Sequence, residues 1–396
     1  MTSLRGAAVL ALVVLTADRA MARTQSRLSS ASQKAIERGA RAAAEDIVRA
    51  GGALGAVVAV KLREEGRQVA TAGFVERERQ TPIDAQRHFQ IGSLTKMFTA
   101  AATLRLLKDG ALRLDERIKG RVSGYAGGAE VTIRQLLNHT SGIGDAVELF
   151  WPAKIYPTNR FTFDELLTIS RLQGQQYPPG ARFKYNETGM NILGRITELE
   201  SGGTLAEFLR RRITGPLGMR DTYSGTGERW PGAKMARAYF NPAGSDSAIE
   251  TTTQGDFNLS WAFAAGDMIS TADDLLKWGR ALLDPANPVG ISLRDLTAEP
   301  IARQTPGPDT GYGFGIAEHS LAGRTVWGHG GHVYGYLSFF IVDPVADIEI
   351  VILTNLDGDP KVNPSDVYSR RILPAATALL HLTIGVDAAR DPRDPR

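Results

Sequence analysis

The spacing of hydrophobic positions changes along this chain, and each spacing predicts a different kind of element. Between residues 94 and 109 large apolar side chains recur every three or four positions, which predicts a largely buried helix that ends at Gly110. Short apolar runs between turn residues predict strands. These runs cover 53–62, 67–75, 312–316, 335–342 and 348–354. Further helices are predicted over 32–50, behind a cap at Ser270 or Thr271, and over 367–382.

Between the two groups of strands, the character of the sequence changes. From about 120 to 261, short helical stretches alternate with loops rich in Gly, Pro, Asn and Asp. This order predicts an α+β fold in which both chain ends build one antiparallel sheet flanked by helices. The sheet lobe is expected over 23–119 and 262–385, with a mainly helical lobe inserted over 120–261. A ligand site is expected in the cleft between the lobes.

The two ends of the chain have compositions of their own. Arg5 precedes an apolar stretch of about ten residues, and a small-residue site follows at Ala20-Met-Ala22, which predicts a cleaved signal peptide over 1–22 and a periplasmic or secreted protein. An uncleaved signal anchor is the alternative. No later segment reaches the roughly 20 apolar residues of a membrane span. Residues 386–396 are expected to form a polar tail.

Composition excludes several classes of function. The 396 residues are 43% hydrophobic and 22% charged, as in a globular protein. The net charge of +3 comes from dispersed basic residues, so a nucleic-acid partner is not expected. The chain has no cysteine, which rules out disulfides, a thiolate nucleophile and cysteine-bound metal.

Ser93 and Lys96 are the first candidates for chemistry. They lie three residues apart at the start of the predicted 94–109 helix, so they share one helix face and a neutral lysine amine could take the serine proton. Free backbone N–H groups at the helix N-terminus also favour negative charge beside the serine. Alone, this spacing equally fits a serine cap with a solvated lysine one turn later.

Two further segments could complete a serine mechanism. Tyr185 follows a Pro-Gly turn, and a phenol beside an ammonium is expected to lose its proton more easily and so relay protons; the alternative is a packing residue. In Trp327-Gly-His-Gly-Gly-His332, the glycines would let a ligand approach backbone N–H groups, as in an oxyanion hole. His329 and His332 have the spacing of two metal ligands, but no third ligand is evident.

Taken together, these segments resemble the class C beta-lactamase-like serine hydrolases. The matching motifs stand in family order over roughly residues 35 to 385. They are Ser93-Leu-Thr-Lys96, Leu136-Leu-Asn-His-Thr-Ser-Gly142, the Pro-Gly before Tyr185, residues 266–275, Gly311-Tyr-Gly-Phe-Gly315 and His329-Gly-Gly331. The family includes class C beta-lactamases, D-alanyl-D-alanine carboxypeptidases, D-amino-acid peptidases and carboxylesterases, all of which use an acyl-serine intermediate without a cofactor.

The resemblance assigns roles to individual residues. Ser93 would be the nucleophile, Lys96 the amine that activates it and Tyr185 the phenol that moves protons. Backbone N–H groups of Ser93 and His332 would form the oxyanion hole, and His329 and Gly331 would contact substrate. Whether Lys96 or Tyr185 is the base stays open.

Two positions depart from the pattern of true beta-lactamases and bear on the substrate. Glu187 replaces the asparagine of the usual Tyr-x-Asn motif, and an ionised carboxylate cannot donate a hydrogen bond to a substrate carbonyl. Glu187 would instead favour a substrate that carries an amine, or leave the amide contact to Asn186. His329 replaces the lysine of the third motif, and an imidazole is charged only part of the time at neutral pH.

We therefore predict an exported serine hydrolase that acts on a small ester or a D-amino-acid peptide or amide. The alternatives are a true class C beta-lactamase and a non-catalytic ligand-binding relative. A Ser-His-Asp hydrolase with a Gly-x-Ser-x-Gly elbow is set aside, because no serine of the chain has that surrounding.

Overall fold

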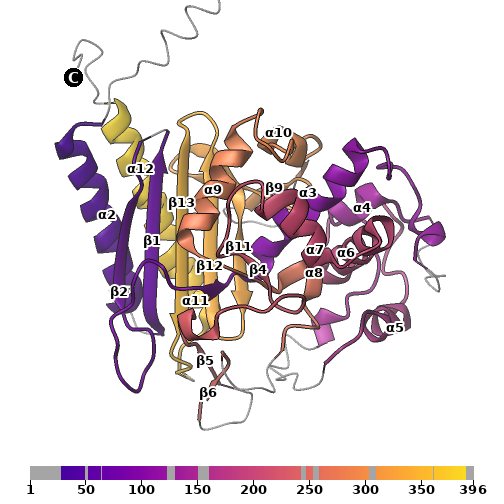
Figure 1. Ribbon diagram of the computed structural model, residues 1–396, viewed down its shortest axis with the longest axis horizontal. Helices are drawn as coiled ribbons and strands as arrows, with labels where there is room; N and C mark the ends of the chain where they lie inside the picture. Colours follow the sequence, from indigo (N-terminus) through magenta and orange to yellow (C-terminus); the bar gives the residue numbers. More distant parts are fainter. Residues whose placement is uncertain are drawn as a thin grey trace, which may run out of the picture.

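The computed structural model supports the predicted architecture, a sheet with a helical lobe beside it (Figure 1). It describes residues 28–388 except 50, 51, 64, 123–129, 150–159, 242–246, 253–257, 303–308 and 360. The predicted signal peptide over 1–22 lies outside the described residues. Among the described residues, no helix is both long enough and apolar enough to span a bilayer.

The main sheet has eight antiparallel strands and is assembled from both parts of the chain, as predicted. In sheet order the strands are β2 (Gln68–Gly73), β1 (Ala53–Leu62), β13 (Ile348–Leu356), β12 (Tyr336–Asp343), β11 (Arg324–Val333), β10 (Ala317–Leu321), β9 (Asp309–Tyr312) and β8 (Ile301–Ala302). The seam between the two ends of the chain is the β1–β13 pair, in which Val57 lies opposite Leu353.

Both faces of this sheet are buried, which explains why its central strands read as continuous apolar runs. Side chains alternate between two cores because successive residues of a strand point to opposite faces. In β1, Val57 and Ala59 belong to the core shared with the helical lobe, while Val58 and Val60 belong to the core on the other face.

Helices from the two ends of the chain cover one face of the sheet, and α9 covers the other. On the first face, α2 (Ser30–Arg49) packs on β1 and β2 and contacts α12 (Leu373–Ala388), which continues from α11 (Pro364–Val367) and the π-helical η7 (Tyr368–Ile372). On the opposite face, α9 (Ala272–Leu283) packs on β1, β12 and β13, and Thr271 caps its N-terminus. Figure 1 shows α2 and α12 side by side at the sheet end of the molecule.

Helix α3 (Thr95–Lys108) joins the sheet to the helical lobe. Most of its residues are buried, including polar Thr95, Lys96, Thr99 and Thr103, because α6 and α8 pack against it. The remaining helices are α4 (Ile133–Leu137), α5 (Phe163–Gln173), α6 (Glu187–Ser201), α7 (Leu205–Leu209), α8 (Phe263–Gly266) and α10 (Leu293–Leu296). Short helical turns lie at η1 (Gly92–Leu94), η2 (Ile118–Gly120), η4 (Val147–Leu149), η5 (Arg210–Thr214) and η6 (Gly232–Lys234).

Two small sheets complete the structure, and the sequence pattern did not predict them. One contains β3 (Phe89–Gln90), β7 (Met268–Ser270) and β4 (Tyr223–Ser224), and the other pairs β5 (Tyr239–Phe240) with β6 (Ile249–Glu250). Strands of two or three residues are too short to show a hydrophobic period.

Two predicted boundaries need correction. The strand predicted over 312–316 is wrong, because β9 ends at Tyr312 and a tight turn, in which the Gly313 N–H donates to the Ile316 carbonyl at 2.8 Å, leads into β10. The tail predicted over 386–396 is wrong at its first three residues, because α12 continues through Ala388 and Asp387 accepts a 2.8 Å hydrogen bond from Arg63. The rest of the predicted tail, 389–396, lies outside the described residues.

Candidate active site

Ser93 lies where the chain passes from the small sheet into α3. It occupies the 3₁₀ turn η1, directly before the first residue of α3, and it borders a cavity of about 810 Å³. Gly92 starts this turn with φ of +53°, a conformation that favours glycine. The predicted position of Ser93 at a helix N-terminus is therefore confirmed.

Lys96 lies one turn later with its ammonium group directed at Ser93. Its Nζ lies 3.0 Å from Ser93 Oγ and 2.8 Å from the Ala265 carbonyl oxygen, and it forms an ion pair with Glu187. The Lys96 side chain is completely buried. The structure thus excludes the solvated lysine that the spacing alone allowed.

Two opposing effects set the protonation of Lys96. Burial disfavours the ammonium and lowers the pKa of Lys96, whereas the charges of Glu187 and, less strongly, Asp145 act in the opposite direction. Burial is the larger effect, so the pKa of Lys96 lies below its usual value. Lys96 is therefore a buried amine whose proton depends on neighbouring carboxylates.

Tyr185 contacts both members of this pair. Its side chain is hydrogen-bonded to Ser93, and Lys96 Nζ lies 4.7 Å from the centre of its ring. The expectation that the tyrosine loses its proton easily is wrong, because burial and the negative charge of Glu187 raise the pKa of Tyr185 well above 10. Tyr185 is a neutral phenol at physiological pH, able to donate a proton to a neighbouring group.

Glu187 begins helix α6 and places a carboxylate at the edge of the cavity. Its backbone N–H donates to Asp145 Oδ2 at 2.8 Å, while its side chain contacts Lys96 and remains 20% exposed. Asp145 is buried and also accepts hydrogen bonds from the Val147 N–H at 3.1 Å and the Thr188 hydroxyl at 3.2 Å. Burial raises the pKa of Asp145 to about 6.

His329 borders the cavity from β11, opposite this acidic group of residues. Its Nδ1 lies 2.6 Å from the Gly330 carbonyl, so Nδ1 carries the proton, and Nε2 accepts from the Tyr312 hydroxyl at 3.0 Å. Burial, together with the charge of Lys96, lowers the pKa of His329 to about 3. His329 is therefore neutral, and the place of the third-motif cation carries no positive charge.

Gly331 and His332 bring β11 against the turn that holds Ser93. A Cβ atom on Gly331 would lie 2.1 Å from the Ile91 carbonyl oxygen, and one on Gly92 would lie 2.8 Å from the His332 nitrogen. The lack of side chains at these two glycines thus allows the close approach. Backbone contact between the two segments is what an oxyanion hole from the Ser93 and His332 N–H groups requires, and this role stays a prediction.

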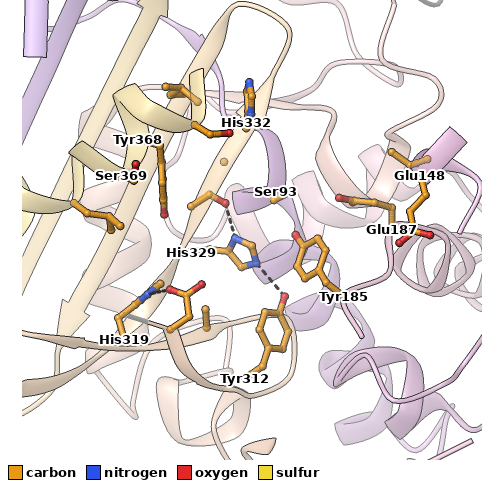
Figure 2. Close-up of a pocket in the computed structure, with 18 of the residues that line it drawn as sticks. Ser93, Glu148, Tyr185, Glu187, Tyr312, His319, His329, His332, Tyr368 and Ser369 are labelled. Carbon is orange, nitrogen blue, oxygen red and sulfur yellow. Dashed lines mark hydrogen bonds and ion pairs between the residues drawn. The ribbon is translucent and has the colours of Figure 1, made fainter. Parts of the chain in front are cut away.

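All the predicted site residues except the buried Lys96 border one cavity. Ser93, Tyr185, Glu187, His329, Gly331 and His332 border it. Figure 2 shows Glu187 and Glu148 beyond Tyr185, on the side of the cavity away from Tyr368 and Ser369.

The two histidines of β11 do not point toward a common point. His329 and His332 are three residues apart in a strand, so their side chains leave opposite faces of the sheet. Within the part of the chain that the structure describes, no group of three His, Cys, Asp or Glu side chains is placed to bind a metal ion.

Three residues of the site were not singled out from the sequence. Asp145 accepts a hydrogen bond from the Glu187 N–H, and Tyr312 donates one to His329. His139 contacts the turn that carries Tyr185. His139 Nδ1 accepts the Asn186 N–H at 3.3 Å, and its ring lies 4.6 Å from that of Tyr185. His139 and Tyr312 stand inside motifs that carried the resemblance, whereas Asp145 lies three residues past one of them.

Comparisons with known proteins agree with this geometry. The family model described as beta-lactamase matches residues 40–373. Penicillin-binding protein 4 of Amycolatopsis lactamdurans is 30% identical over 76% of this chain and 80% of its own length. Esterase EstB of Burkholderia gladioli is 28% identical, over 76% of this chain and 86% of its own length.

Relatives that act on D-amino-acid compounds are also found. A D-aminopeptidase of Cereibacter sphaeroides is 29% identical over 69% of this chain, which spans about half of that relative's length. Among solved structures, the D-amino acid amidase of Ochrobactrum anthropi SV3 has a TM-score of 0.78 and 27% identity, and the match covers 89% of this chain and 99% of the amidase.

Proposed function

The chain belongs to the beta-lactamase family. From this premise we propose that it is an exported serine hydrolase that forms an acyl-serine intermediate with a small ester or with a D-amino-acid peptide or amide. The observation that carries the proposal is the contact of Ser93 with both Lys96 and Tyr185 at the wall of an open cavity. The relatives include D-aminopeptidases, an amidase and an esterase.

In this mechanism Lys96 is the base and Tyr185 the proton donor. Neutral Lys96 takes the proton of Ser93, and Oγ bonds to the substrate carbonyl carbon while the Ser93 and His332 N–H groups stabilise the oxyanion. Tyr185 donates its proton to the leaving amine or alcohol and regains one from Lys96, and water then hydrolyses the acyl ester by the reverse path. The high pKa of Tyr185 and the lowered pKa of Lys96 support this division of roles.

The charges around the cavity favour a substrate with an amine over a penicillin. Asp145 and Glu187 border the side of the cavity next to Lys96, whereas neutral His329 stands where beta-lactamases have a cation. An ammonium is attracted to the first side, and a substrate carboxylate finds no cation at His329. D-amino-acid amides and amino esters therefore rank above cephalosporins as substrates.

A nitrophenyl ester tests the reaction itself. We expect wild-type protein to release nitrophenol from p-nitrophenyl acetate above a Ser93→Ala control, and the intact mass to increase by one acetyl group on the wild type alone. Neither release nor adduct would point instead to a non-catalytic ligand-binding relative.

A substrate panel then ranks the activities. It contains D-alanine amide, its L enantiomer, short-chain esters and a chromogenic cephalosporin. We expect D-alanine amide or the esters to be preferred, and strong cephalosporin turnover would contradict this ranking.

Export is a separate part of the proposal and rests on the sequence of residues 1–22. Expression in a Gram-negative host should give a periplasmic or secreted protein whose mass lacks Met1 to Ala22. A fractionated protein that retains these residues would instead favour a signal anchor.

A further inference from the structure

Glu187 is placed to interact with the protein interior and with a ligand in the cavity. Its carboxylate forms the ion pair with Lys96, which is completely buried, yet its own side chain is 20% exposed and borders the cavity. A bound substrate can therefore reach Glu187 without displacing Lys96. The Tyr-x-Asn motif of beta-lactamases has an asparagine at this position and therefore no carboxylate.

The hydrogen bonds of Lys96 fit two protonation states that differ in reactivity. An ammonium has three N–H donors, and Lys96 has three neighbours to accept them: the Ala265 carbonyl, Glu187 and Ser93 Oγ. In that state Lys96 donates to Ser93 and cannot take its proton. A neutral amine keeps donors for the carbonyl and the carboxylate and directs its lone pair at Ser93 Oγ, which is the reactive arrangement.

The charge beside Lys96 decides between these states. Burial alone favours the neutral amine, and the carboxylates of Glu187 and Asp145 oppose it. The other titratable groups that face Lys96, Tyr185 and His329, are uncharged at neutral pH. Among the described carboxylates, Glu187 is the one that both contacts Lys96 directly and borders the cavity.

We infer that Glu187 is a substrate-operated switch on Lys96: it holds the ammonium form in the free enzyme and releases it when the ammonium group of a substrate binds to the Glu187 carboxylate. The inference rests on the proposed function, and it adds the substrate class: D-amino-acid amides or esters with a free α-amine. The substrate cation both neutralises Glu187 and repels the charge on Lys96, so Lys96 loses a proton to solvent and becomes the base.

The subsequent reaction balances without another reactant. Neutral Lys96 accepts the Ser93 proton as the Oγ–carbonyl bond forms, and the leaving amine departs with the proton that Tyr185 donates. Glu187 therefore acts on kcat, in addition to any contribution that it makes to binding. A simple recognition residue would change KM and leave the protonation of Lys96 unchanged.

Two substrates that differ only in the amine separate these possibilities. We compare D-alanine p-nitroanilide with propionic acid p-nitroanilide and measure kcat against pH for wild-type protein. The acid limb of kcat reports protonation of the base in the enzyme–substrate complex, and we expect it to lie at least about one pH unit lower with the amine substrate. Coincident acid limbs with different KM values would overturn the inference.

A pair of glutamate variants assigns the effect to one carboxylate. In Glu187→Gln we expect the two acid limbs to coincide, because the amide neither holds the ammonium form nor binds the substrate cation. Glu148→Gln is the matched control, since Glu148 borders the same cavity but pairs with Lys184, and it should retain the difference. A difference that persists in Glu187→Gln would contradict the assignment.

The result remains informative if a variant does not fold, because the decisive comparison uses wild-type protein alone. Failure of the proposed function is also distinguishable, since it would remove the Ser93-dependent reaction with p-nitrophenyl acetate. If the enzyme reacts with this ester and the acid limb of kcat lies at the same pH for both anilides, the proposed function is retained and the switch is absent.

Discussion

Two buried bases belong to the same site, and the protein treats them in opposite ways. Lys96, between α3 and α6, is completely buried and faces a carboxylate. His329, on β11, is 6% exposed, and among the described residues its hydrogen-bond partners are a tyrosine hydroxyl and a backbone carbonyl. Burial lowers the pKa of both. The opposing effect on Lys96 comes from a carboxylate in direct contact, Glu187, whereas on His329 it comes from the Gly330 carbonyl and, less strongly, from the charge of Asp309.

The difference indicates that the two halves of the site have different tasks. In the proposed mechanism, the charges of the α3–α6 half transfer protons and select a cationic substrate, because the Glu187 carboxylate can be reached from the cavity. On the β9–β11 half, His329 is neutral and the Asp309 carboxylate is paired with His319 at 2.7 Å, so we expect this half to contribute shape and hydrogen bonds. Removing groups from each half tests this division.

The largest effect is expected from Lys96→Gln. This change keeps a hydrogen-bond donor for the Ala265 carbonyl but removes the base, so kcat/KM for a nitrophenyl ester should fall by about 10³-fold. The matched change His329→Gln retains both hydrogen bonds of the imidazole and should cost less than about 10-fold. Equal losses in the two variants would contradict the division between the halves.

A smaller effect is expected from the two tyrosines. Tyr185→Phe removes the proton donor and should reduce turnover by at least about 100-fold, the usual scale for lost acid–base catalysis. Tyr312→Phe removes only the hydroxyl that binds His329, and steady-state kinetics should show a loss below about 10-fold. If Tyr185→Phe also loses less than about 10-fold, Tyr185 has no place in the mechanism.

The lowered pKa of His329 predicts how the free energy of unfolding depends on pH. Its pKa is about 3 in the folded protein and near 6.5 when unfolded, so the unfolded state binds a proton first as pH falls. Its contribution to the free energy of unfolding is therefore fully present above pH 6.5 and is lost progressively toward pH 3. Urea denaturation at pH 7.5 and 5 should show that His329→Gln loses about 2 kcal/mol less than wild type over this interval.

The smallest effect is expected from Glu148, whose side chain is 47% exposed and paired with Lys184. Exposed ion pairs contribute about 0–1 kcal/mol, so Glu148→Gln should leave the urea midpoint and the rate with p-nitrophenyl acetate nearly unchanged. A large loss of activity with this uncharged ester would give Glu148 a catalytic role that its position does not indicate.

Hydrophobic patterning predicted the frame of the fold because its central elements are long and strongly apolar. Helix α3 and strands β1, β12 and β13 lie where their spacing placed them. The pattern failed at β10, where a strand of five residues carries Glu318, His319 and Ser320 and shows no continuous apolar run. It failed again at β9, where glycines after Tyr312 form a turn.

The site was predictable as a set of residues and less so as an electrostatic arrangement. Ser93 and Lys96 are close in sequence, so helical spacing alone placed them together. The contact between Lys96 and Glu187 joins residues 91 positions apart, and only folding creates it. The high pKa of Tyr185 depends on its complete burial, which no local pattern reports.

The pairing of β1 with β13 also sets the order in which the enzyme becomes complete during synthesis. Ser93 leaves the ribosome well before β11, which approaches it, and β13, which joins the two parts of the sheet. A nascent chain therefore carries Ser93 and Lys96 before it carries the strand expected to stabilise the oxyanion. Activity should arise only after β11 and β13 have been made and have joined the sheet.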